Sequence, residues 1–148
     1  SQAKGRLSIY SLPADGASFV LKDGFHAPVT FEFSSSTNSG SNIINIPGNP
    51  NLATVRESVV NTINNYGPSL LIEAFVENSV VKLKNVRFSS LGNQDISKST
   101  NTFDVLGMSG GAGGDCANGM DCRSDLDCRS NFCSVDCTSG VCMSKCQP

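Results

Sequence analysis

The chain has 148 residues and a formal net charge of −2, and only 16% of its residues are charged. This composition argues against two classes of partner. The chain contains no basic stripe interleaved with aromatic residues, so nucleic acid is not expected. Its apolar runs are far shorter than the ~20 residues that a membrane-spanning helix needs. Abundant Ser, Asn, Thr and Gly are typical of a β-rich secreted domain.

The first expected strand covers residues 6–10, where Leu7 and Ile9 alternate with polar neighbours, and residues 12–16 are expected to form a turn. The first strand of a chain is placed naturally at a sheet edge, where unpaired N–H and C=O groups invite pairing with another chain. Leu7, Ile9 and Leu12 are therefore candidates for an assembly strand that is donated to a second copy. In the alternative, the strand completes its own sheet.

Residues 18–22 and 29–33 flank Asp23-Gly24 and are expected to form a hairpin. A further strand is expected at residues 43–46. The side chains expected to meet in the core across the hairpin are Phe19, Leu21, Phe31 and Phe33.

One helix is expected, from Thr54 to Tyr66. Thr54 and Glu57 fit the pattern of a capping box at its start, and Gly67-Pro68 is a stop signal at its end. Its apolar face at helical spacing consists of Val55, Val59 and Ile63.

Three more strands are expected, at residues 70–76, 80–86 and 102–106. The first two are joined across a turn at residues 77–79. A helix packed on mostly antiparallel strands predicts an α+β fold, a sandwich-like β domain with one helix.

The chain divides into a β-rich domain at 1–106, a glycine-rich linker at 107–115 and a cysteine-rich module at 116–148. About a fifth of this module is cysteine, above the ~8–10% typical of disulfide scaffolds. Disulfides persist in oxidising compartments, which predicts an extracellular or cell-surface protein. The start at Ser1 fits a mature product whose signal peptide has been removed. The cysteines are Cys116, Cys122, Cys128, Cys133, Cys137, Cys142 and Cys146.

Seven cysteines cannot all pair within one chain. Three internal disulfides would leave one thiol that is free or bridges to another chain, and six cysteines allow 15 pairings. Metal binding is disfavoured because the C-x2-C spacing of a zinc site is absent. Calcium could use Asp121, Asp125 and Asp127, but the glycine and glutamate of an EF-hand loop are missing. No cofactor is expected.

Catalytic residues are not expected either. His26 is interpreted as a loop histidine, and Ser109 lacks the spacing of a nucleophile elbow. Four glutamates could in principle pair as acid and base, but one is assigned to the helix cap and the others fall on or beside strands. They are Glu32, Glu57, Glu73 and Glu77.

Residues 7–111 resemble a small β-rich domain that recurs in large bacterial surface proteins and in phage virion proteins. The resemblance is carried by residues 15–19, residues 29–33, the capped helix, residues 81–85, Leu91-Gly92-Asn93 and the ending Gly107-Met108-Ser109-Gly110-Gly111. It implies a structural or adhesive module without site residues. Residues 121–133 and Gly140-Val141-Cys142 are similar to cysteine-rich modules appended to secreted proteins.

The sequence thus predicts an extracellular structural protein, a self-assembling subunit of a bacterial surface filament or fibre. Its expected partner is a second copy, bound through a donated strand or an intermolecular disulfide. Two alternatives stay open: a phage virion decoration or tail protein, and an adhesin or ligand-binding module of a larger surface protein.

Overall fold

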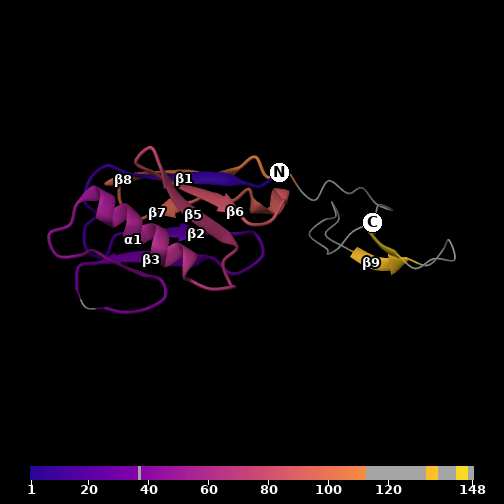
Figure 1. The fold of residues 1–148 in the computed structure, drawn as a ribbon, viewed down its shortest axis with the longest axis horizontal. Coiled ribbons are helices and arrows are strands. Elements are labelled where there is room, and N and C mark those ends of the chain that lie inside the picture. Colours follow the sequence, from indigo (N-terminus) through magenta and orange to yellow (C-terminus); the bar gives the residue numbers. More distant parts are fainter. Residues whose placement is uncertain (37, 113–132, 137–142, 147–148) are drawn as a thin grey trace.

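The structure, a computed structural model, describes residues 1–36 and 38–112, and the strands β9 (Cys133–Asp136) and β10 (Met143–Cys146). Residues 1–112 form a sandwich of two four-stranded sheets (Figure 1). Sheet A contains, in spatial order, β5 (Ile72–Glu77), β6 (Val80–Asn85), β1 (Lys4–Ile9) and β8 (Phe103–Ser109). Sheet B contains β4 (Ile43–Asn45), β3 (Val29–Ser34), β2 (Ser18–Leu21) and β7 (Ser97–Lys98).

All neighbouring strands in these two sheets are antiparallel except β3 and β4, which are parallel. The predicted α+β class is confirmed. The sequence did not predict two short elements. One is β7, whose two residues are too few to give a periodic pattern, and the other is the 3₁₀ turn at Ser90–Gly92.

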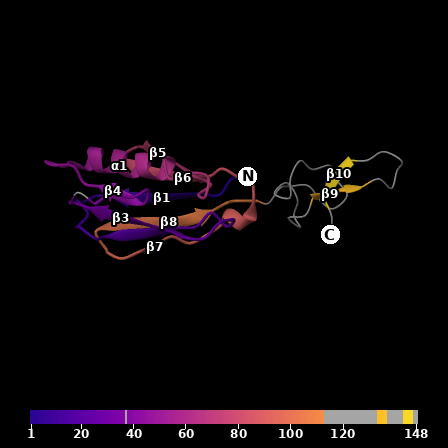
Figure 2. The same cartoon turned by 90° about the horizontal axis from the view of Figure 1, so that it is seen from below.

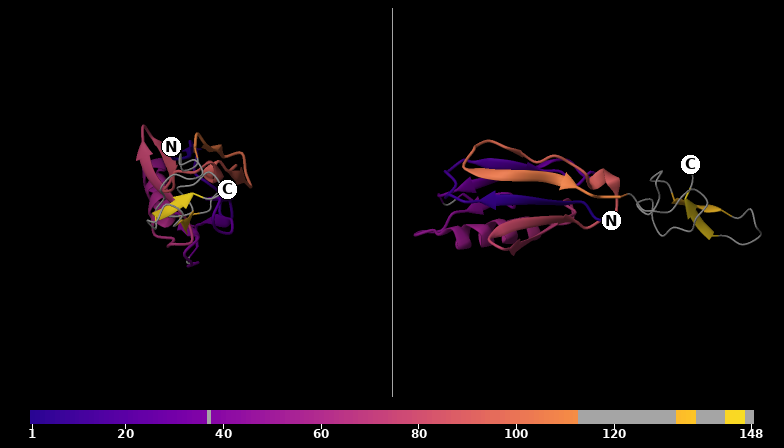
Figure 3. Two further views of the ribbon diagram at one scale, coloured as in Figure 1. Left: turned by 90° about the vertical axis from the view of Figure 1, so that its right-hand side faces the viewer. Right: turned by 90° about the horizontal axis from the view of Figure 1, so that it is seen from above.

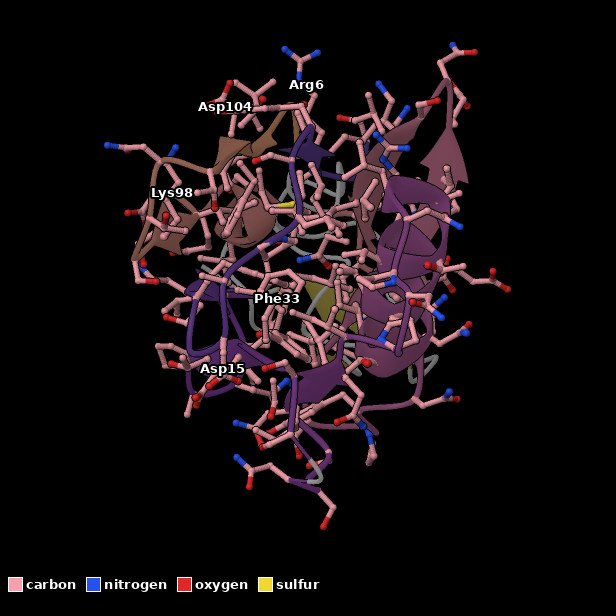
Figure 4. All side chains as sticks on the ribbon, turned by 90° about the vertical axis from the view of Figure 1, so that its left-hand side faces the viewer. Arg6, Asp15, Phe33, Lys98 and Asp104 are labelled. Atoms are coloured by element: carbon pink, nitrogen blue, oxygen red, sulfur yellow. The ribbon has the colours of Figure 1, made fainter. Side chains whose placement is uncertain are left out.

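The core lies between the sheets, and aromatic rings join its two sides. Phe103 of sheet A meets Phe19 edge-on at a centroid distance of 6.1 Å and Phe33 at 5.8 Å. Phe33 lies in the middle of the molecule in Figure 4, which looks along the sandwich. The predicted hairpin is confirmed as the β2–β3 pair, and its four expected core side chains are all buried.

The helix α1 (Leu52–Asn64) packs against β5, β6 and β4 and closes one side of the sandwich (Figure 2). Its predicted apolar face is confirmed, because Val55, Val59 and Ile63 are buried. On the other side of the sandwich, Lys98 Nζ of β7 donates to the carbonyl oxygen of Phe103 on β8 at 2.7 Å.

The predicted start of the helix is wrong. The capping residue is Asn51, whose side chain accepts from the Thr54 backbone N–H at 2.9 Å. The Thr54 hydroxyl oxygen accepts in return from the Asn51 backbone N–H at 3.2 Å. Thr54 is therefore the third residue of the helix, and Glu57 is not part of the cap. Asn is among the most favoured capping residues, so it begins the helix earlier than a threonine cap would.

Strand β8 reaches into the segment that the sequence assigns to the linker. Gly107 packs against the backbone of Asp95, Met108 is buried, and the Ala112 N–H donates to the carbonyl oxygen of Ser1 at 3.0 Å. The boundary predicted after residue 106 thus falls inside a strand. The β-rich domain therefore extends at least to Ala112.

The predicted edge position of the first strand is also wrong. β1 lies between β6 and β8, so both of its backbone edges are paired (Figure 3). Leu7 and Ile9 are buried in their own core, whereas Leu12 is 47% exposed. Position in the chain does not set position in the sheet, because the later strands β6 and β8 add on both sides of β1. The structure supports the alternative in which this strand completes its own sheet.

A test of the helix packing is Val59→Asp, which we expect to unfold the β-rich domain. Val59 is 0% exposed, and a buried carboxylate without a partner costs several kcal/mol, comparable to the stability of a small domain. The matched control is Asn61→Asp on the exposed face of α1. Thermal unfolding followed by circular dichroism measures both. A Val59→Asp protein as stable as the control would show that this face is not buried.

Candidate docking face on sheet A

The outward face of sheet A carries a cluster of positive charge on its two central strands. Strand β1 alternates, so burying Leu7 and Ile9 turns Lys4 and Arg6 outward. In the same way β6 buries Val81 and Leu83 and turns Lys82 and Lys84 to the outer side. In Figure 4, Arg6 points away from the molecule.

The register of the two strands places these cations side by side. Lys4 lies opposite Lys84, and Arg6 lies opposite Lys82. Directly opposed residues have Cβ atoms ~4.5–5.5 Å apart, and residues two apart on one strand are separated by ~7 Å. The four side chains therefore form one compact group, which we call the basic block.

Apolar and acidic residues of the outer strands border the basic block. On β5, Phe75 lies opposite Lys82 and Glu73 opposite Lys84. On β8, Leu106 lies opposite Arg6. A hollow of about 590 Å³ covers this face and is lined by the basic block together with Gly5, Phe75, Glu77, Leu83, Leu106 and Ser109. Phe75 is 42% exposed and Leu106 51% exposed, so apolar side chains flank the charges on both sides.

The charges of the basic block are poorly compensated. Only one ion pair reaches it within the described residues, Lys84 Nζ to Glu73 Oε2 at 3.5 Å. Like charges directly opposite each other destabilise a sheet. Lys22 and Lys98, outside the basic block, each have a carboxylate partner, Asp95 at 2.6 Å and Asp104 at 3.4 Å. The basic block is therefore suited to an anionic partner, which would relieve the repulsion.

A second polar cluster lies inside the fold at Asp23. Its carboxylate is 1% exposed and accepts from the backbone N–H groups of Phe25 and His26 at 2.7 Å and of Leu71 at 2.9 Å. His26 Nδ1 lies 2.8 Å from the same carboxylate. The backbone oxygen of Asp23 accepts from Asn85 Nδ2 at 2.9 Å. Since Leu71 and Asn85 belong to the β5 and β6 side, this cluster ties the loop after β2 to sheet A.

The surroundings of Asp23 lower its pKa. Burial by itself raises the pKa, but the hydrogen bonds from the His26 ring and from the backbone of Leu71, Phe25 and His26 outweigh it. The net result is a pKa below the ordinary value of 3.8. His26 is thus held against a buried structural carboxylate.

The other residues weighed at the sequence level do not gather into one site. Ser109 ends β8 and lines the hollow, which Glu77 of β5 also lines. Glu73, also on β5, lies opposite Lys84. Glu32 is on β3 and Glu57 is on the exposed side of α1. In residues 1–36 and 38–112, no three His, Cys, Asp or Glu residues are grouped as metal ligands.

The cysteine-rich module is described only at β9 and β10, so the other cysteines and Asp121, Asp125 and Asp127 lie outside the described residues. The two strands are antiparallel and place Cys146 directly opposite Cys133.

Sequence reasoning missed the basic block. The signal was present as two alternating pairs, Lys4-Gly5-Arg6 and Lys82-Leu83-Lys84. Either segment alone matches the outward face of an ordinary strand. Only the hydrogen-bonded pairing of β1 with β6 brings the four cations together.

Comparisons with known proteins found no matching protein-family model, no matching curated protein and no matching solved structure. In the part of the chain that the structure describes, no helix has the length and apolar character needed to cross a membrane.

One prediction concerns Asp23→Asn, which leaves the part-buried Leu71 N–H without its carboxylate acceptor. We expect a loss on the order of 2 kcal/mol in the free energy of unfolding at neutral pH. A lowered pKa contributes stability above the unfolded pKa, and this contribution disappears as the pH falls through the folded pKa. The difference between the two proteins should therefore shrink below about pH 4.

Denaturant titrations at several pH values measure this difference. Asp104→Asn is the control, since that carboxylate is exposed. Equal losses from Asp23→Asn and Asp104→Asn would contradict the structural role of Asp23.

A further prediction concerns the cysteine-rich module, where we expect three internal disulfides and one thiol that is free or bridges to another chain. Alkylation of free thiols followed by mass spectrometry under non-reducing conditions counts them. Four or more free thiols in the native protein would refute the disulfide scaffold.

Proposed function

We propose that the chain is an extracellular, non-catalytic structural subunit that assembles with copies of itself. The observation that carries this proposal is the outer face of sheet A, where the basic block lies in a shallow hollow between exposed Phe75 and Leu106. An interface typically combines apolar contact area with charge complementarity, and this face offers both.

The cysteine content supports the extracellular placement. A module of 33 residues with seven cysteines needs an oxidising compartment to form its disulfides. With three internal disulfides, the seventh thiol could add a covalent link between copies. We propose that the subunit belongs to a bacterial surface filament or fibre. In the alternative, the chain is a virion decoration or tail protein that assembles in the same way.

The basic block also favours a second candidate, an adhesive module that binds an anionic polymer at a surface. Four neighbouring cations with one carboxylate partner would bind sulfate or carboxylate groups of such a polymer.

Self-assembly predicts a sedimentation coefficient that rises with protein concentration. Analytical ultracentrifugation of the full chain should show species larger than a monomer at low ionic strength. The same samples at ~1 M salt, where the Debye length is ~3 Å, should lose them. A reducing agent added in parallel separates the contribution of an intermolecular disulfide. A protein that stays monomeric at every concentration in low salt would refute self-assembly.

A further inference from the structure

We infer that the occupant of the basic block is the acidic segment 121–127 of a second copy of this chain. This inference deepens the proposed function and rests on it, since it names the partner of the same face. It is argued from the distribution of charge, from spacing and from the direction in which the chain leaves the domain.

The two parts of the chain differ in charge balance. Residues 1–112 carry eight acidic and eight basic residues, whereas residues 113–148 carry five acidic and three basic ones. Three of these five acidic residues fall within seven positions, at Asp121, Asp125 and Asp127, with Arg123 as the one cation between them. One chain thus carries a basic surface on its domain and an acidic segment in its cysteine-rich module.

The spacing of the two sets of charge also matches. Asp125 and Asp127 are two residues apart, as are Lys4 and Arg6, and Lys82 and Lys84. An extended segment would present the two carboxylates on one side, ~7 Å apart. That is the separation of the cations along β1 and along β6, so each carboxylate can bind between one cation of each strand.

The path of the chain favours a neighbouring copy. β8 runs antiparallel to β1 and passes Arg6 before it reaches Lys4. Beyond it, the Gly110 oxygen accepts from the Ser1 hydroxyl at 2.6 Å, and Ala112 pairs with Ser1. The chain therefore leaves the domain heading away from Arg6 and Lys82.

This contact joins two different surfaces of the same chain. Such a head-to-tail contact leaves one free surface at each end of every complex, and it grows into a filament where the rotation does not close a ring. The charged groups of the basic block lie at the surface. Each ion pair in the contact should therefore contribute little by itself, and added salt should weaken the contact.

The test uses two charge-reversed variants of the full chain. The face variant is Lys82→Glu/Lys84→Glu, and the segment variant is Asp125→Lys/Asp127→Lys. A second face variant, Lys4→Glu/Arg6→Glu, reverses the same surface from the other strand in case the first fails to fold. The control, Lys22→Glu/Arg87→Glu, makes an equal charge change outside the basic block. Circular dichroism and a count of free thiols verify that each variant is folded and oxidised as the parent is.

We expect each reversed variant alone to dissociate at least about tenfold more readily than the parent in ultracentrifugation, because like charges now face each other. The control should assemble as the parent does. Mixing the face variant with the segment variant should restore assembly, since each then meets the opposite charge on the other. Rescue by mixing requires direct contact between the two surfaces on different copies.

Two outcomes would overturn the inference while leaving self-assembly intact: a face variant that assembles as the parent does, or a mixture that does not recover. A third outcome is that the parent and the segment variant bind an immobilised sulfated polysaccharide while the mixture of variants does not recover assembly. This outcome would show that the basic block binds an external polyanion. A parent protein that is monomeric throughout would instead refute the proposed function itself.

Discussion

The register of β1 is the constraint on which the rest of the structure depends. This strand is paired on both sides, and its alternation decides at once which residues fill the core and which face outward. With Leu7 and Ile9 inside, Lys4 and Arg6 must be outside. A slip of one residue would bury both cations and expose the apolar pair, which a core of this size could not tolerate. The fold and the basic block therefore have the same physical origin.

Two features hold the sheets around that strand. The Phe19, Phe33 and Phe103 rings pack across the sandwich, with Phe103 from the partner strand of β1. The buried Asp23 carboxylate joins the β2–β3 loop to the backbone before β5 by accepting from the N–H groups of Phe25 and Leu71. These contacts hold the two sheets together beneath the outer face of sheet A. The repulsion between the opposed cations is an energetic cost, which an anionic partner would offset.

Local patterns in the sequence predicted much of the fold. The helix face of Val55, Val59 and Ile63 and the β2–β3 hairpin follow from residue spacing, so both could be found without a structure. Sheet order could not, because no local pattern tells that β6 and β8 flank β1, and the basic block depends on that order. The role of Asp23 was hidden for a similar reason. Its partners Leu71 and Asn85 are distant in sequence, and Asp23-Gly24 alone matches an ordinary turn.

The central claim is that assembly covers the outer face of sheet A. Amine-reactive labelling of lysines, read by mass spectrometry at low and high protein concentration, tests it within one molecule. Labelling of Lys4, Lys82 and Lys84 should fall as assemblies form, while that of Lys22 and Lys98, which lie outside the basic block, should stay constant. Labelling of Lys82 and Lys84 that is unchanged in the assembled protein would contradict the account.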